Sequence, residues 1–270
     1  MPYADVRGQR LYYEDSGGAG TAVVLGHGFL MDADMFKPQM AALGGSHRVI
    51  VWDQRGHGRT TFDGQPFTYW DSAHDLAALL DHLGIERAVV GGMSQGGFVS
   101  LRFALAYPRR TLGLILIDSQ SGLEDPDKVA QYDAMHDVWV GSGPSDQLLD
   151  MVAAIIVGNH APESPAWIAK WRAMDPAALT PIYRTLIDRD DVTPRLAEID
   201  VPVLVVHGTD DVAIDMSVAE DLCTRLKDCR LVKVEGAGHA SNETHPGPVN
   251  QAIGDFLAAL DPALSRSRTS

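Results

Sequence analysis

A serine between two glycines is the residue of this chain best suited to covalent chemistry. The segment GMSQG at residues 92–96 follows a short apolar run and precedes a helix-like stretch at 98–106. A serine on a tight turn between a strand and a helix is held in strained backbone geometry with its hydroxyl exposed. The pattern predicts that Ser94 is a nucleophile.

A histidine late in the chain can act as the base. His239 lies between the last predicted strand and the final predicted helix, in a loop able to reach Ser94. The order serine, acid, histidine, with each residue at a strand end, favours it over His207. We interpret His57, in a tight loop, and His245, at the entry to a helix, as structural residues.

An acid is needed to orient the histidine and to stabilise the imidazolium that forms during attack. The segment GTDD at 208–211 follows a predicted strand and offers Asp210 and Asp211, between which the residue pattern alone does not decide. Asp118, at the end of an earlier predicted strand, is a third candidate.

A small-residue turn can supply hydrogen bonds to a developing oxyanion. The segment GHGF at 26–29 comes directly after a predicted strand, and the amides of Phe29 and Gln95 are the expected donors. Removing one such donor typically costs about 10²- to 10³-fold in rate.

Short apolar runs bounded by Gly, Asp or Ser provide the frame for these turns. Such runs, separated by helix-like stretches, indicate buried parallel strands in a βαβ arrangement. An alternating segment closed by a glycine-rich turn predicts a strand at a hairpin edge over 9–15. The parallel strands are expected at 22–25, 49–52, 88–90, 112–117, 201–206 and 231–234, and helices at 72–83, 216–226 and 249–260.

The strand rhythm stops between residues 121 and 196, where short helical stretches are punctuated by seven prolines. We therefore expect a mostly parallel α/β core, formed by residues 1–120 and 197–270, that carries a helical cap at 121–196. Large apolar side chains of this cap should pack it onto the core, and some should line a cleft with the turn after residue 29. The candidate substrate-binding residues are Leu30, Met31, Trp139, Trp167 and Trp171.

Composition excludes several classes of partner. A formal net charge of −14 disfavours nucleic acid, and no apolar run approaches the roughly 20 residues of a membrane-spanning helix. The two cysteines, Cys223 and Cys229, match neither a metal pair nor a redox pair, so free thiols in a reducing, cytoplasmic compartment are expected, with a disulfide between them as the less favoured alternative. No secretory signal, metal signature or nucleotide motif is visible. The polar run at 265–270 predicts a frayed end.

The motifs HGF, DQRGHG, GMSQG, GTDD and GAGH, in this order, cover nearly the whole chain and resemble the α/β-hydrolase superfamily. The resemblance implies the α/β-hydrolase fold and no cofactor. In that family the acid commonly stands three residues after the glycine, which implies Asp211, and the residue after His-Gly supplies an oxyanion amide, which implies Phe29. The turns at 27–39 and 49–59 are also similar to those of small enol-lactonases and of cofactor-free haloperoxidases or perhydrolases.

The nucleophile's identity narrows the chemistry. Epoxide hydrolases and haloalkane dehalogenases of this fold use an aspartate where Ser94 stands, whereas a serine points to acyl chemistry. We expect a serine hydrolase that cleaves a small, largely apolar ester or lactone through an acyl-enzyme, as a monomer or a homodimer. Perhydrolase, haloperoxidase or carbon–carbon bond hydrolase activity remains an alternative, as does a non-catalytic small-molecule binding protein.

Overall fold

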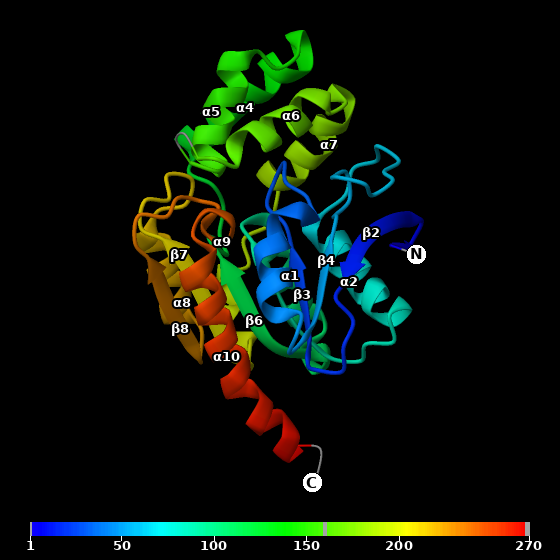
Figure 1. Cartoon of the computed structure of the whole chain (residues 1–270). Helices are drawn as coiled ribbons and strands as arrows, with labels where there is room; N and C mark the ends of the chain where they lie inside the picture. Colours follow the sequence, from blue (N-terminus) through cyan, green and yellow to red (C-terminus); the bar gives the residue numbers. More distant parts are fainter. Residues whose placement is uncertain (1, 159–160, 268–270) are drawn as a thin grey trace.

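One mixed sheet forms the centre of the molecule (Figure 1). The computed structural model describes residues 2–158 and 161–267, with side chains up to Leu260. The strand order is β1-β2-β4-β3-β5-β6-β7-β8; the first two strands run antiparallel to their neighbours and the others are mutually parallel. The strands are β1 (Tyr3–Val6), β2 (Gln9–Asp15), β3 (Ala22–Gly26), β4 (Arg48–Trp52), β5 (Ala88–Met93), β6 (Thr111–Ile117), β7 (Val203–Gly208) and β8 (Cys229–Val234). The predicted α/β fold with a mostly parallel sheet is confirmed.

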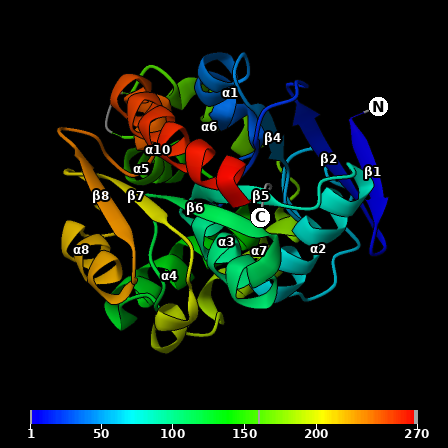
Figure 2. The same cartoon turned by 90° about the horizontal axis from the view of Figure 1, so that it is seen from below.

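Helices cover both faces of the sheet (Figure 2). One face carries α1 (Lys37–Leu43) and α10 (Pro246–Ser267), and the other carries α2 (Tyr69–His82), α3 (Gln95–Ala106) and α8 (Met216–Arg225). Neighbouring residues of one strand supply opposite cores: Val23 and Leu25 pack on the α10 side, whereas Val24 packs on the α3 side. Strands buried on both faces need continuous apolar runs, which is why these runs were visible in the sequence.

Four helices between β6 and β7 gather at one end of the molecule, at the top of Figure 1. They are α4 (Pro126–Ser142), α5 (Asp146–Ile156), α6 (Ser164–Ala173) and α7 (Pro176–Ile187), and we call them the cap. Buried cap residues such as Trp139 and Leu149 belong to the same apolar cluster as Val23 of the sheet. The cap is therefore packed onto the core through side chains rather than tethered by its connections alone.

Several elements differ from the sequence prediction in their presence or in the residues at which they begin or end. Strand β1, which the sequence did not predict, pairs with β2 through a turn at Arg7 and Gly8, both at positive φ. Helix α2 begins at Tyr69, three residues before its predicted start, because Thr68 and Asp71 form a reciprocal capping box. Helix α10 continues to Ser267, against the expected frayed end; residues 268–270 lie outside the described part of the chain.

The expectation of free thiols is wrong. Cys223, near the end of α8, and Cys229, at the start of β8, form a disulfide with their Cα atoms 5.5 Å apart. The chain reverses between helix and strand, which brings two cysteines six residues apart into bonding range. The inferred reducing compartment therefore loses its support. Among the described residues, no helix is both long and apolar enough to cross a membrane.

Candidate active site

Ser94 occupies the turn between β5 and α3 in a backbone conformation that serine seldom adopts. Its φ and ψ are 49° and −110°, and its side chain borders a pocket. Strained conformations of this kind cost about 1–3 kcal/mol and persist only where the surroundings impose them. Here the amide of Ser94 donates to Ile117 O at 2.8 Å, and Ser119 Oγ donates to the carbonyl of Ser94 at 2.8 Å. The carboxyl ends of β5 and β6 thus hold the predicted nucleophile in place.

Close packing of glycines makes this turn possible. A Cβ atom on Gly96 would collide with the carbonyl of Gly26, so the first turn of α3 can lie against the end of β3 only without a side chain. Likewise, a side chain on Gly28 would strike Met93, the residue before the nucleophile. The GHGF turn and the serine turn are therefore neighbours in space, as an oxyanion site requires.

Among the three acidic candidates, the structure brings Asp211 to His239. Asp211 Oδ2 lies 2.8 Å from His239 Nδ1, and Asp211 Oδ1 accepts from the amides of Ala213 and Ile214 at 2.8 and 2.9 Å. Asp210 is exposed and contacts the hydroxyl of Thr209. With Nδ1 bound to a carboxylate, Nε2 is the ring nitrogen left to act as a base.

The contact between Asp211 and His239 shifts the pKa of both residues. Burial opposes a charged imidazole, but the Asp211 carboxylate outweighs it and raises the pKa of His239 above its usual value of 6.5. Burial alone would raise the pKa of Asp211, yet the contact with His239 lowers it. Asp211 therefore stays ionised and stabilises a protonated His239, which is what proton transfer from a serine needs.

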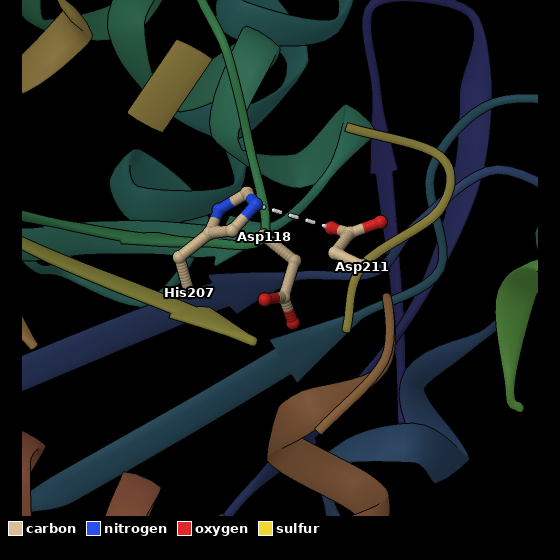
Figure 3. Close-up of side chains that lie close together, drawn as sticks. All are labelled: Asp118, His207 and Asp211. Atoms are coloured by element: carbon tan, nitrogen blue, oxygen red, sulfur yellow. Dashed lines mark ion pairs between the residues drawn. The ribbon is translucent and has the colours of Figure 1, made fainter. Parts of the chain in front are cut away.

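Asp118 and His207 lie close to Asp211, and His207 contacts its carboxylate (Figure 3). Asp118 Oδ1 accepts from the amide of Gly208 and Oδ2 from the amide of Ser241, each at 2.9 Å, which ties β6 to the chain segments that carry Asp211 and His239. Burial is the main cause that raises the pKa of Asp118 to about 6.

His207 Nε2 lies 3.3 Å from Asp211 Oδ2 and 2.8 Å from the carbonyl of Ile214. Ligand atoms of Asp118, His207 and Asp211 fall within 4.8 Å of one another, as in a metal site. However, the carboxylate of Asp118 already accepts hydrogen bonds from two backbone amides, and that of Asp211 is bound to His239. His207 Nε2 must carry a proton to donate to the carbonyl of Ile214, so it has no free lone pair for a metal. These bonds indicate a scaffold for the acid rather than a metal site.

A buried histidine orients one predicted oxyanion donor. His27 Nε2 accepts from the amide of Gln54 at 2.9 Å, so the proton is on Nδ1, which lies 2.8 Å from the carbonyl of Gly28. In a planar trans peptide the carbonyl of Gly28 and the amide of Phe29 point in opposite directions. Holding that carbonyl therefore fixes where the Phe29 amide points. Burial lowers the pKa of His27 to about 4, so it remains neutral.

The second predicted donor, Gln95, is the first residue of α3, and its amide belongs to the helix end that lacks intrahelical acceptors. The hydroxyl of Tyr69 donates to Gln95 Oε1 at 3.1 Å and steadies this residue. His57 does not line the Ser94 pocket; its Nδ1 lies 2.8 Å from Arg55 O, and burial lowers its pKa to about 3. His245 lies beside the hydroxyl of Thr244.

Ser94 and His239 border one pocket between core and cap, with a volume of about 110 Å³. Phe29 and Leu30 line it from the core and Trp139 from the cap. The cap helices add six aliphatic residues to the lining, together with Tyr132, His136 and Tyr183; the aliphatic ones are Met135, Val152, Ile155, Ile156, Leu179 and Leu186. Sequence reasoning missed all six of these residues, because an apolar helix position that faces a cavity looks like one that faces a core.

Three of the predicted substrate-binding residues lie elsewhere. Met31 and Trp171 border a second, wider cavity of about 530 Å³, which contains neither Ser94 nor His239. Trp167 lines neither cavity; its indole N–H donates to the carboxylate of Glu243 at 2.9 Å. The wide indoles of α6 are therefore used to fasten the cap to the core.

Trp171 fastens the cap to the oxyanion turn itself. Its indole N–H donates to the carbonyl of Leu30 at 2.8 Å, and Leu30 has a φ of 63°, which is unfavourable for a branched side chain. The preceding residue of the helix, Lys170, pairs with Asp32 at 2.6 Å. Helix α6 thus holds the segment that begins with Phe29, and Trp171 is a positioning residue for it.

Replacing Trp171 with phenylalanine should lower kcat on an activated ester about tenfold and change KM less than about threefold. The ring still packs, but Leu30 loses its hydrogen bond and the Phe29 amide its fixed direction. Steady-state kinetics measures this split. Trp139→Phe is the matched control, since Trp139 lines the pocket and its indole N–H has no hydrogen-bond partner in the described part of the chain; it should act mainly on KM. An unchanged kcat for Trp171→Phe would contradict the positioning role.

Comparison with known proteins is consistent with this geometry. The sequence model of the alpha/beta hydrolase fold family matches residues 21–246. The chain is 29% identical over 267 residues to a putative carbamate hydrolase, RutD, of Azorhizobium caulinodans, covering 97% of this chain and all of the relative.

Two solved structures are also similar. A thermophilic esterase of Thermogutta terrifontis has a TM-score of 0.83 at 30% identity and covers 96% of this chain and 97% of its own. The enol-lactonase of Burkholderia xenovorans LB400 has a TM-score of 0.85 at 28% identity and covers 95% of this chain and 100% of its own. The chain therefore belongs to the α/β-hydrolase fold family.

Proposed function

We propose that this protein is a serine hydrolase that cleaves a small, largely apolar ester or lactone. The single observation that carries the proposal is the contact of 2.8 Å between His239 Nδ1 and Asp211, with His239 and Ser94 on the wall of one apolar pocket. This combination leaves His239 Nε2 as a base within a site that holds a serine on a strained turn. The similarity to an esterase and an enol-lactonase supports the same reaction class.

In the proposed reaction, Ser94 Oγ attacks the substrate carbonyl carbon while His239 Nε2 takes the hydroxyl proton. The amides of Phe29 and Gln95 stabilise the oxyanion of the tetrahedral intermediate. The intermediate collapses as His239 returns the proton to the departing alcohol oxygen, which leaves an acyl group on Ser94. His239 then activates a water molecule that attacks this ester and releases the acid. Asp211 holds the ring and stabilises each imidazolium.

A carbamate is a second candidate substrate, because the relative from Azorhizobium is named as a putative carbamate hydrolase. The same residues would attack its carbonyl, and the difference lies in the rate of the second step. A carbamoyl group on serine is hydrolysed more slowly than an acyl group, since its nitrogen lone pair stabilises the carbonyl.

The test is rapid-mixing kinetics with 4-nitrophenyl butanoate, a six-membered lactone and a 4-nitrophenyl carbamate of similar size. We expect hydrolysis of the ester and the lactone. With a 4-nitrophenyl substrate whose deacylation is slower than acylation, we expect an initial burst of nitrophenolate no larger than the enzyme concentration. Turnover of the carbamate alone would move the assignment to carbamates. Tight retention of these molecules without hydrolysis would contradict the proposal and favour a binding protein.

A plot of kcat/KM against pH should fall on the acidic side, with the midpoint of this acidic limb above pH 6.5. Only neutral His239 can take the Ser94 proton, and the Asp211 carboxylate raises the pKa of His239, so the group becomes inactive at a higher pH than an isolated histidine. We expect kcat/KM to rise about tenfold per pH unit on this limb and then to level off. Initial rates between pH 5 and 9 measure it. A midpoint below pH 6 would contradict the proposed coupling.

A further inference from the structure

A carboxylate inside the pocket has no assigned role in the proposed acyl transfer beyond a minor effect of its charge on the pKa of His239. Glu124 lies between β6 and α4, and its side chain, 10% exposed, lines the pocket that contains Ser94 and His239. The cap residues of that pocket are mostly apolar. A buried carboxylate costs free energy unless it is paired, so its presence in such a wall calls for a partner.

The partners of Glu124 occupy one of its two oxygens. Arg189 Nη2 and Gln120 Nε2 donate to the same atom, Oε1, at 2.9 and 3.0 Å. Arg189 is 2% exposed at its side chain and also donates to the carbonyls of Gly122 and Leu186 at 3.0 and 2.7 Å. The guanidinium is thus fixed by surrounding backbone and holds the carboxylate in one orientation.

The other oxygen, Oε2, accepts from no described residue. It is also absent from the buried polar atoms of the described chain that lack a partner, so it retains contact with open space. Since Glu124 is one of the residues that line the pocket, we infer that Oε2 faces it. An acceptor with a free lone pair therefore faces the cavity in a position fixed by Arg189.

Charge decides which group this acceptor suits. The guanidinium of Arg189 already balances the charge of Glu124, and most of the pocket lining is uncharged and apolar, so a cationic substrate would be desolvated without a counter-ion of its own. A neutral N–H or O–H group costs much less free energy to desolvate, and it can donate a hydrogen bond to the free lone pair of Oε2.

We propose that Glu124 is a specificity-determining residue whose Oε2 accepts a hydrogen bond from a neutral hydroxyl or amide N–H of the substrate, away from the scissile carbonyl. This inference rests on the proposed function and adds a substrate class to it: apolar acyl compounds that carry one hydrogen-bond donor. A site built to bind a donor rejects the analogue that lacks it far more strongly than an apolar pocket rejects a missing methylene.

Substrates of one shape provide the test. We would use 4-nitrophenyl benzoates that carry a hydroxymethyl, an ethyl or an acetyl group at the meta or para position; hydroxymethyl has a donor, ethyl has neither donor nor acceptor, and acetyl has only an acceptor. For the better-placed position, kcat/KM should be at least tenfold higher for hydroxymethyl than for ethyl. Equal values at both positions in the wild-type protein would overturn the proposal, whether or not any variant folds.

The variant Glu124→Gln gives a sharper outcome. Its Oε1 can still accept from Arg189 and Gln120, which leaves the amide nitrogen, a donor, facing the pocket. The hydroxymethyl preference should fall at least tenfold and the acetyl ester should gain, while the ethyl ester stays within about threefold of wild type. Gln120→Met removes one donor to Oε1, but Gln120 does not itself line the pocket and Arg189 still holds the carboxylate, so this variant should keep the wild-type preference.

An equal loss on all three substrates in Glu124→Gln would instead make Glu124 a structural partner of Arg189 and overturn the proposal. Failure of the proposed function is distinguishable, since no ester would then be hydrolysed. In that case calorimetric titration with benzyl alcohol and ethylbenzene tests Glu124 alone. The alcohol should bind at least tenfold more tightly to wild type than ethylbenzene does, and equal affinity would overturn the proposal.

Discussion

Replacing Ser94 with alanine is expected to lower kcat on 4-nitrophenyl butanoate by about 10⁴-fold or more. The variant loses the atom that forms the acyl-enzyme, and what remains is the oxyanion site and the pocket, which alone give a small residual rate. Steady-state rates measure the loss. Binding of an unreactive substrate analogue should change little, because Ser94 is one small part of a mostly apolar wall.

Ser121→Ala is the matched control for this substitution. Ser121 is a buried serine of the same region, its hydroxyl lies 2.9 Å from that of Thr193, and it does not line the pocket. We expect its kcat to stay within about threefold of wild type. Thermal unfolding monitored by circular dichroism shows whether both variants are folded. A Ser94→Ala protein that is folded and retains most of its activity would remove Ser94 from the mechanism.

Replacing Asp211 with asparagine should lower kcat by about 10⁴-fold while the fold persists. Asparagine can keep the bonds from Ala213 and Ile214 through its oxygen, but its NH₂ group then faces His239 Nδ1. His239 Nδ1 must then accept a hydrogen bond from this NH₂ group. The ring proton therefore moves to Nε2, and the histidine cannot take a proton from Ser94. Steady-state kinetics at a pH on the plateau of the wild-type profile, above the acidic limb, measures the effect.

The neighbouring Asp210→Asn is a close control because it changes the same residue type one position away. Asp210 is exposed and its carboxylate contacts only the hydroxyl of Thr209 among the described residues, so its removal should change kcat less than about threefold. Equal losses in the two variants would contradict the assignment of Asp211 as the acid. A mild loss in Asp211→Asn would point to Asp118 as a substitute, because its charge also acts on His239.

The turn that carries Ser94 could be predicted from the sequence because its determinants are local. The apolar run of β5, the flanking glycines and the start of α3 are adjacent in the chain, and parallel strands bring their carboxyl ends to one edge. The position of His239 follows from the same rule. The choice between Asp210 and Asp211 came from family resemblance, since it depends on which side chain points inward after β7, and residue types do not show that.

Other features depend on partners distant in sequence. The carboxylate of Glu124 is held by Arg189, 65 residues later, and no local pattern marks the pair. The indoles of Trp167 and Trp171 looked like pocket residues because large apolar side chains in a cap can serve either a cavity or an interface. Their N–H groups donate to Glu243 and Leu30, contacts that only the packing of α6 on the core reveals.

The disulfide and the edge strand β1 were not predicted from the sequence for a different reason. Cys223 and Cys229 match no motif, and their bond follows from the reversal between α8 and β8. Strand β1 has four residues, too few to establish an alternating pattern beside the stronger signal of β2. Both features lie away from the pocket, so the proposed chemistry does not depend on them.

The most direct test of the central claim is mass spectrometry of the protein after treatment with a fluorophosphonate, which reacts with an activated serine. We predict one adduct per chain, located by peptide mapping on Ser94, formed at least about 10²-fold more slowly in Asp211→Asn and not at all in Ser94→Ala. An adduct on another residue, or one that persists in Ser94→Ala, would contradict the account.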